Sequence, residues 1–237
     1  MVVAMFLAHL IGDYILQWDG LARWKSLEWR GVLAHGTIVW LVTWLFSLPF
    51  NAAWWPWALF IGLTHTAVDA LPLWLSKRVS WQDSGALALA RYLLDQVVHV
   101  SIIIIALVSS GYLAMPSLAA DLALALHQNR LLVFVMGYAF LTMPAWILVE
   151  FAVHGLVKGT APDFSETRNR YVGILERGLI TTFVMMGQFV LVPLVALPRL
   201  VVERPLVMGS HRASLYLTEL LASVTLAVAV GLGLRWL

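Results

Sequence analysis

The chain has 237 residues, of which 61% are hydrophobic and only 12% carry a formal charge. This composition excludes a protein whose surface is mostly in contact with water, and it indicates an integral membrane protein. The net charge of +2 is explained by the basic residues that membrane proteins carry in their cytoplasmic loops, so nucleic-acid binding is not expected. Since cysteine is absent, disulfides and thiolate metal ligands are excluded as well.

Apolar segments of roughly 20 residues, the length that crosses a bilayer, recur along the whole chain. They predict an all-α, polytopic membrane bundle of about seven transmembrane helices, formed by residues 1–237 as a single domain. Residues 1–113 are expected to form a four-helix bundle, and residues 114–237 to add three further helices and connecting loops. The predicted spans are residues 2–17, 31–50, 52–76, 88–113, 130–157, 172–198 and 214–237.

Two stretches between these spans are expected to lie at the membrane surface. The stretch "WDGLARWKSLEWR", residues 18–30, mixes apolar and basic side chains and predicts a short amphipathic helix. The stretch "AMPSLAADLALALHQN", residues 114–129, is too short and too polar to cross, so it predicts an interfacial loop or helix.

The distribution of basic residues predicts the orientation. With the N-terminus outside and the C-terminus in the cytoplasm, eleven of the fifteen lysines and arginines fall on the inner side. The loop from Arg199 to Arg212 is richer in arginine than this rule favours for an outer loop. We therefore expect a multi-pass membrane protein in contact with membrane lipid; the sequence predicts no oligomeric state.

Three pairs of histidine and aspartate, four residues apart, lie within the predicted spans, and each pair shares one helix face. They are His9 with Asp13, His65 with Asp69, and Asp95 with His99. The pair in span four has the reverse order, and span four runs in the direction opposite to spans one and three. The three aspartates are therefore expected in one layer near the cytoplasm, with the histidines one turn deeper. His35, near the start of span two, falls in the histidine layer.

These seven side chains predict a metal site inside the bundle. Neutral imidazoles and carboxylates bind divalent cations, and the cation offsets the cost of keeping carboxylates in apolar surroundings. A His/Asp donor set without sulfur suits zinc, manganese or iron, and seven ligands exceed the needs of one tetrahedral ion, so one or two ions are expected. Any aspartate among Asp13, Asp69 and Asp95 that does not bind metal is a candidate catalytic base.

The expected function is a metal-dependent hydrolase that acts on an amphiphilic lipid or phosphoester substrate from the cytoplasmic leaflet. A transporter or channel for protons or divalent cations, and a non-catalytic membrane subunit, are the alternatives; a hydrogen bond between helices would explain a single pair. Transporters usually bind their cargo near the midplane at repeat-related broken helices. The one-sided polar cluster and the absence of an evident repeat favour the enzyme.

Four further polar residues are candidates for a supporting role. Glu150 and His154, in "EFAVH", form either a pair at the membrane surface or part of a shell around the metal or substrate. Glu176 and Arg177, in "GILERGLI", form either an ion pair within the bundle or, through Arg177, a site for an anionic head group.

Three motifs carry a resemblance to a known family. "HLIGDYILQ", "HTAVDALPLWL" and "LLDQVVHV", in this order, resemble the motifs of an uncharacterised family of small bacterial inner-membrane proteins, domain-of-unknown-function family 3307. "YVGILERGLI" followed by "GQF" resembles the C-terminal part of its longer members. The resemblance implies that the His/Asp positions are family motifs, and it implies no reaction. The resemblance does not extend to residues 114–170, so it implies no role for Glu150 and His154.

A looser similarity lies in the use of HxxxD pairs on membrane helices. In this feature the chain is similar to the membrane-bound metal-dependent hydrolases, which implies a metal site and a hydrolytic reaction.

Overall fold

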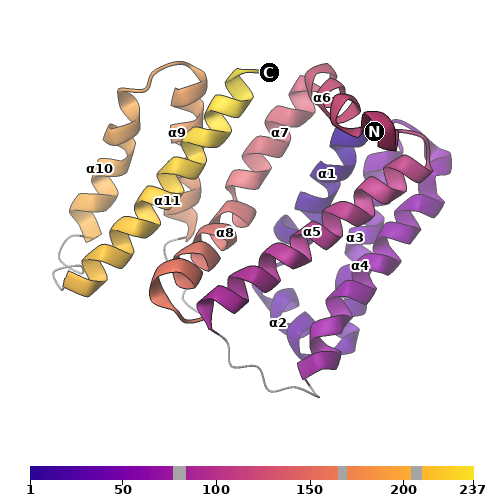
Figure 1. Ribbon diagram of the computed structural model, residues 1–237, viewed down its shortest axis with the longest axis horizontal. Coiled ribbons are helices and arrows are strands. Elements are labelled where there is room, and N and C mark those ends of the chain that lie inside the picture. The colour runs from indigo at the N-terminus through magenta and orange to yellow at the C-terminus, as the bar shows by residue number, and fades with distance from the viewer. Residues whose placement is uncertain (77–83, 165–169, 204–209) are drawn as a thin grey trace. The chain divides into compact units, whose positions relative to one another are not determined.

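The computed structural model describes residues 1–76, 84–164, 170–203 and 210–237. Its regular elements are helices (Figure 1), and within the described residues the one β feature is an isolated bridge between Ser84 and Thr160. The all-α class predicted from the sequence is confirmed.

The chain divides into two compact units, and each is described by itself. The first contains residues 1–82 and 93–139, and the second contains residues 83–92 and 140–237. The single domain expected from the sequence stays a prediction.

The first unit carries all seven predicted metal ligands. Its elements are α1 (Val2–Leu10), a π-helical turn (Ile11–Ile15), α2 (Asp19–Leu27), α3 (Trp29–Ser47), a 3-10 turn (Ala52–Trp54), α4 (Trp55–Ser76), most of α5 (Gly85–Ser109), a 3-10 turn (Met115–Ser117), α6 (Leu118–Gln128) and most of α7 (Arg130–Leu141). Helix α2 lies where the sequence predicts a short amphipathic helix, and α6 lies where it predicts an interfacial loop or helix.

The second unit contains the rest of α5 and α7 and the C-terminal elements. These are α8 (Met143–Val153), a π-helical turn (His154–Lys158), α9 (Arg170–Met185), α10 (Leu191–Glu203) and α11 (Ser210–Arg235).

The prediction of seven membrane spans is wrong for the described residues. By length and composition, two helical stretches there suffice to cross a membrane, Gly85–Ser109 and Ala213–Arg235. A third candidate is the pair Met115–Gln128 and Arg130–Leu141, which is bent by 96°. The described part of the chain therefore offers two spans, or three if the bent pair counts as one.

Breaks in the helices explain most of the difference. The predicted span 172–198 consists of α9 and α10, which are 16 and 13 residues long and separated by a turn with Gly187 at φ 77°. The predicted span 130–157 is likewise divided between α7 and α8, of 12 and 11 residues. The segment Val2–Ile15 is only about 21 Å long at 1.5 Å per residue, shorter than the hydrocarbon core of about 30 Å.

Helices α3 and α4 are 19 and 22 residues long, which is long enough for a span. They are not candidate spans because their composition is not apolar enough. They carry His35, His65 and Asp69 together with several tryptophans, which lower the hydropathy of any 18-residue window. The predicted orientation stays a prediction, because it depends partly on Lys77, Arg78, Arg168 and Arg204, which lie outside the described residues.

A close approach between α3 and α4 positions two of the histidines. A Cβ atom at Gly36 would lie 3.0 Å from the Cβ of Thr66 and would overlap its Oγ1. Thr66 Oγ1 cannot turn away freely, since it donates a 2.7 Å hydrogen bond to the Gly62 carbonyl of its own helix. His35 and His65 directly precede Gly36 and Thr66, so this contact brings the two imidazoles together.

We expect Gly36→Ala to destabilise the protein by about 1–3 kcal/mol, because the added methyl group forces α3 and α4 apart. The measurement is thermal unfolding of the detergent-purified protein. Gly178→Ala is the matched control, since a Cβ there meets nothing within 4 Å and alanine favours a helix over glycine by about 1 kcal/mol. Thr66→Ala should restore part of the stability of Gly36→Ala. Equal melting temperatures for the two alanine variants would contradict the packing argument.

Candidate metal centre

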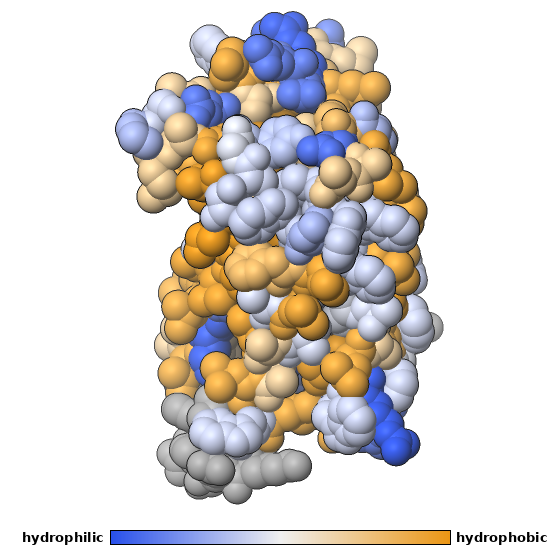
Figure 2. All heavy atoms as spheres, turned by 90° about the vertical axis from the view of Figure 1, so that its right-hand side faces the viewer, coloured by the Kyte–Doolittle hydropathy of each residue, from blue (hydrophilic) through white to orange (hydrophobic). Residues whose placement is uncertain are grey.

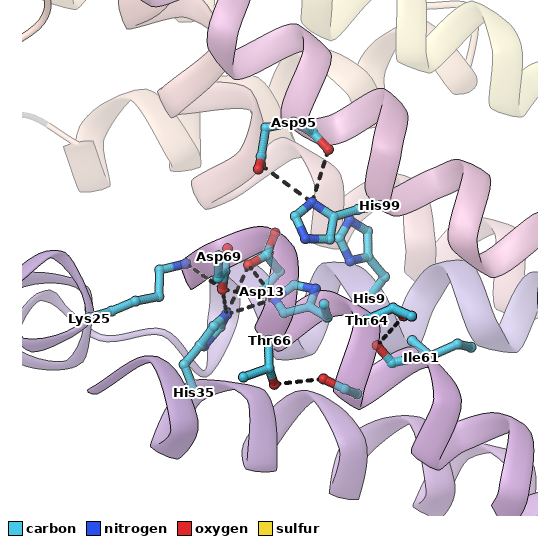
Figure 3. Close-up of polar contacts among 12 residues, drawn as sticks. His9, Asp13, Lys25, His35, Ile61, Thr64, Thr66, Asp69, Asp95 and His99 are labelled. Atoms are coloured by element: carbon cyan, nitrogen blue, oxygen red, sulfur yellow. Dashed lines mark hydrogen bonds and ion pairs between the residues drawn. The ribbon is translucent and has the colours of Figure 1, made fainter. Parts of the chain in front are cut away.

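Two histidine nitrogens and two aspartate oxygens converge at the centre of the first unit (Figure 3). Asp13 comes from the π-helical turn after α1, His35 from α3, and His65 and Asp69 from one face of α4. The distances are 3.1 Å for His35 Nε2 to Asp13 Oδ1, 3.1 Å for His35 Nε2 to His65 Nε2, 3.2 Å for His65 Nε2 to Asp69 Oδ2, 3.5 Å for His35 Nε2 to Asp69 Oδ2, and 3.6 Å for His65 Nε2 to Asp13 Oδ1.

These separations fit a divalent cation. Metal bonds of about 2.0–2.2 Å to nitrogen and oxygen place neighbouring ligands of a four- to six-coordinate ion about 3.0–3.6 Å apart. All five distances among the two imidazoles and the two carboxylates fall within that range. The donor set, nitrogen and oxygen without sulfur, is suited to zinc, manganese or iron.

Hydrogen bonding alone satisfies this cluster only in part. His35 Nε2 lies within 3.5 Å of Asp13, His65 and Asp69, but a nitrogen carries at most one proton and donates to one of them well. The two Nε2 atoms of His35 and His65 lie 3.1 Å apart: if both are protonated, two N–H groups face each other, and if one is not, its lone pair lies against a carboxylate. His35 is fully buried and His65 is 1% exposed, so water does not relieve this repulsion. A cation at the centre would be attracted by all four groups.

His99 has the environment of a metal-binding histidine. Its Nδ1 lies 2.9 Å from the backbone oxygen of Asp95 and 3.4 Å from Asp95 Oδ2, so Nδ1 donates its proton there. This leaves a lone pair on His99 Nε2, which is buried and has no hydrogen-bond partner among the described residues. Histidines that bind metal usually donate their other ring proton to a carboxylate or carbonyl in this way.

The possible ligands form two overlapping groups of three. Asp13, His35 and His65 each offer one atom within 4.8 Å of the others, and so do His65, Asp69 and His99. The ring centroids of His65 and His99 are 4.2 Å apart. His65 belongs to both groups, and because a neutral imidazole has one free lone pair it would bind an ion of only one group at a time.

His9 and Asp95 lie outside both groups. The His9 ring stacks on His99 with centroids 5.7 Å apart, and His9 Nε2 lies 3.4 Å from Gln96 Oε1. The Asp95 side chain is 37% exposed and accepts a hydrogen bond from Gln96 Nε2 at 3.0 Å. Asp95 therefore orients His99, while Asp13 and Asp69 contact the histidine nitrogens directly instead of forming a separate layer with Asp95.

The sequence interpretation missed Lys25 and Gln96. Lys25 Nζ, on α2, donates to Asp69 Oδ2 at 3.1 Å. No local pattern links two residues that are 44 positions apart, so the sequence held no signal for this pair. Gln96 was visible, since it stands inside the motif "LLDQVVHV" next to Asp95.

The four supporting candidates belong to the second unit, whereas the seven predicted ligands belong to the first. His154 Nε2 is 3.7 Å from Glu150 Oε2, and its Nδ1 is 3.2 Å from the Thr160 carbonyl. Glu176 pairs with Arg199, whose Nη1 is 3.4 Å from Glu176 Oε2. Arg199 was predicted in an outer loop, and it forms a second ion pair with Glu219 at 2.7 Å.

Arg177 forms hydrogen bonds with the backbone at the break between α7 and α8. Its guanidinium donates to the carbonyls of Leu141 and Thr142 at 2.9 and 3.3 Å and to Ser223 Oγ at 3.2 Å. Both carbonyls lie at the break, where the Thr142 carbonyl also accepts a hydrogen bond from the Trp146 amide at 3.3 Å. With Arg177 only 2% exposed, its contacts are those of a structural residue and not of an open site for a head group.

One protein family matches the part of the chain that contains the predicted ligands. Residues 1–133 match the family described as a protein of unknown function (DUF3307). This range contains all seven predicted ligands and Lys25, whereas the resemblance at residues 171–189 lies beyond it. No curated protein matches the chain. No solved structure matches it.

Proposed function

The chain belongs to the DUF3307 family, whose match covers more than half of it, and we propose that it is a membrane-embedded, metal-dependent hydrolase of an amphiphilic substrate. The observation that carries the proposal is the convergence of two imidazole nitrogens and two carboxylate oxygens at 3.1–3.6 Å. Asp13, His35, His65 and Asp69 hold one divalent cation, and His99 extends the site toward a second.

Apolar surface supports the location in a membrane. Helix α5 exposes Leu94 and Val97, and α11 exposes Leu217 and Leu221. Figure 2 shows a face whose middle is largely hydrophobic, with the most hydrophilic residues gathered mainly toward its top and bottom. In the proposed orientation the bent pair Met115–Gln128 and Arg130–Leu141 crosses as a third span, so the N-terminus is outside and the C-terminus is in the cytoplasm of the cell, at the inner membrane.

The hydrolytic step follows from the chemistry of the donor set. A bound zinc, manganese or iron ion lowers the pKa of a water and polarises the bond under attack. The protein's own residues fix this geometry: Asp13 and Asp69 balance the charge of the cation, and Asp95 holds the ring of His99 in one orientation. Asp95 is also the most exposed of the three aspartates, which suits a group that exchanges protons with water.

A groove between the start of α3 and the C-terminal part of α4 supports an amphiphilic substrate. Its volume is about 460 Å³, and its walls include Trp29, Arg30, Ala70 and Trp74. Ala70 directly follows Asp69 on α4. Tryptophan rings provide apolar walls at the membrane surface, and a guanidinium binds an anionic head group. The groove is therefore the place where we expect a lipid or phosphoester to bind.

Transport of a divalent cation is the second candidate function, and the burial of the cluster favours it. The cavity that reaches His9, His65 and His99 has a volume of only about 10 Å³, room for about one water. A cation passes through such a space more readily than a lipid does.

Metal analysis of the detergent-purified protein tests the proposal. We expect one or two zinc, manganese or iron ions per chain, and a melting temperature that falls on chelation and recovers when the ion is added back. The protein should then release phosphate-containing products from vesicles of anionic phospholipid, and chelation should stop the release. Bound metal with cation flux and no hydrolysis would replace the enzyme by the transporter. If the protein has no bound metal and is not stabilised by these ions, the hydrolase and the cation transporter are both excluded, and the non-catalytic subunit remains.

A further inference from the structure

Lys25 places a positive charge against the proposed cation site. It lies on α2, a helix of nine residues, and its Nζ donates to Asp69 Oδ2 at 3.1 Å (Figure 3). The Lys25 side chain is 20% exposed, whereas Asp69 is 7% exposed. Lys25 therefore connects the buried cluster to the surface.

The oxygen that Lys25 contacts is the proposed metal ligand. Asp69 Oδ2 is the same atom that lies 3.2 Å from His65 Nε2 and 3.5 Å from His35 Nε2. A protonated lysine has three donors and no lone pair, so it cannot bind a metal ion. An ammonium and a divalent cation on one oxygen repel each other strongly in a site shielded from water.

The balance of charge in the site also indicates that Lys25 and the cation compete for Asp69. Asp13 and Asp69 contribute two negative charges, which one divalent cation balances without Lys25. When the cation is absent, Lys25 balances one of these charges and lowers the cost of burying Asp69. The ammonium and the cation are thus alternative partners for one carboxylate.

The backbone of Lys25 packs closely against the start of α3. A Cβ atom at Gly31 would lie 2.5 Å from the backbone nitrogen of Lys25, which shows how closely the start of α3 approaches α2. The four-carbon stem of lysine can still swing its ammonium toward water.

We propose that Lys25 is a built-in counter-ion that pairs with Asp69 in the metal-free protein and sets the affinity for metal. This inference rests on the proposed metal site and adds its regulation. Binding of the cation displaces the Lys25 ammonium from Asp69, so part of the binding free energy is used to break that ion pair. Such competition keeps a buried site exchangeable.

Removing the charge should therefore tighten metal binding. We expect Lys25→Met to raise the affinity for zinc or manganese at least about tenfold in a competition titration with a chelator. Its metal-free form should melt at a lower temperature and recover when metal is added. Lys25→Gln, whose amide still donates to Asp69, should also bind metal more tightly. It keeps the test possible if the methionine variant does not fold.

Two control variants complete the test. Lys25→Arg keeps the charge and should bind metal with the affinity of the unsubstituted protein. Arg23→Met removes a charge from the same helix at an exposed position and should leave the affinity unchanged. Unchanged or weaker metal binding by both neutral variants, in a protein that does bind metal, would overturn the inference alone. Weaker binding of anionic phospholipid by these variants, with metal affinity unchanged, would assign Lys25 to the substrate instead. Absence of metal from the unsubstituted protein would overturn the proposed function and this inference with it.

Discussion

His35→Ala and His65→Ala are each expected to abolish binding of the ion held with Asp13 and Asp69, whereas His99→Ala should remove only a second ion. The reason is that the nitrogens of His35 and His65 each lie within 3.6 Å of both carboxylates, whereas His99 belongs only to the group with His65 and Asp69. Metal content per chain, measured on the purified variants, checks the expectation.

His127→Ala is the control for this series, since His127 is an exposed residue of α6 outside both groups. It should leave the metal content unchanged. If the alanine variants of His35, His65 and His99 all lose the same amount of metal, the two groups do not act as separate sites. If none of them loses metal, the ions bind elsewhere.

Asp13→Asn and Asp69→Asn are expected to lower metal affinity by about a hundredfold or more, and Asp95→Asn by about tenfold to a hundredfold. Asparagine keeps the shape and hydrogen-bonding capacity of aspartate, so the fold should survive. The two larger effects follow because Asp13 and Asp69 each lose a negative charge within 3.6 Å of two histidine nitrogens. Asp95 acts through His99, so its effect should be smaller. The affinities are measured by competition with a chelator.

Asp121→Asn is the matched control for the loss of a carboxylate. Asp121 Oδ2 accepts hydrogen bonds from the Ala114 amide and Ser117 Oγ at 3.0 Å, at the start of α6. This variant should lose some stability and retain its metal. Full metal affinity in both Asp13→Asn and Asp69→Asn would show that these carboxylates are a hydrogen-bonded structural pair.

The helical class and the pairing of ligands on single helices were predictable because both depend on local geometry. An α-helix turns once in 3.6 residues, so His65 and Asp69 share a face wherever α4 lies. The number of spans was not predictable in the same way. A hydropathy window averages composition over residues 130–157 and 172–198, and it does not register the helix breaks at Thr142 and Gly187.

The sequence by itself determined that this is an all-α, strongly apolar chain with histidine and aspartate one helical turn apart on several helices. The tertiary structure decided which of these side chains meet: Asp13, His35, His65 and Asp69 at one point, with His99 nearby and Asp95 behind it. It also brought Lys25 to Asp69. The physical reason is that spacing along a helix is set by the backbone, whereas contact between helices depends on how their surfaces pack. Here that packing depends on the space that Gly36 leaves for Thr66 and on the close approach of α2 at Gly31.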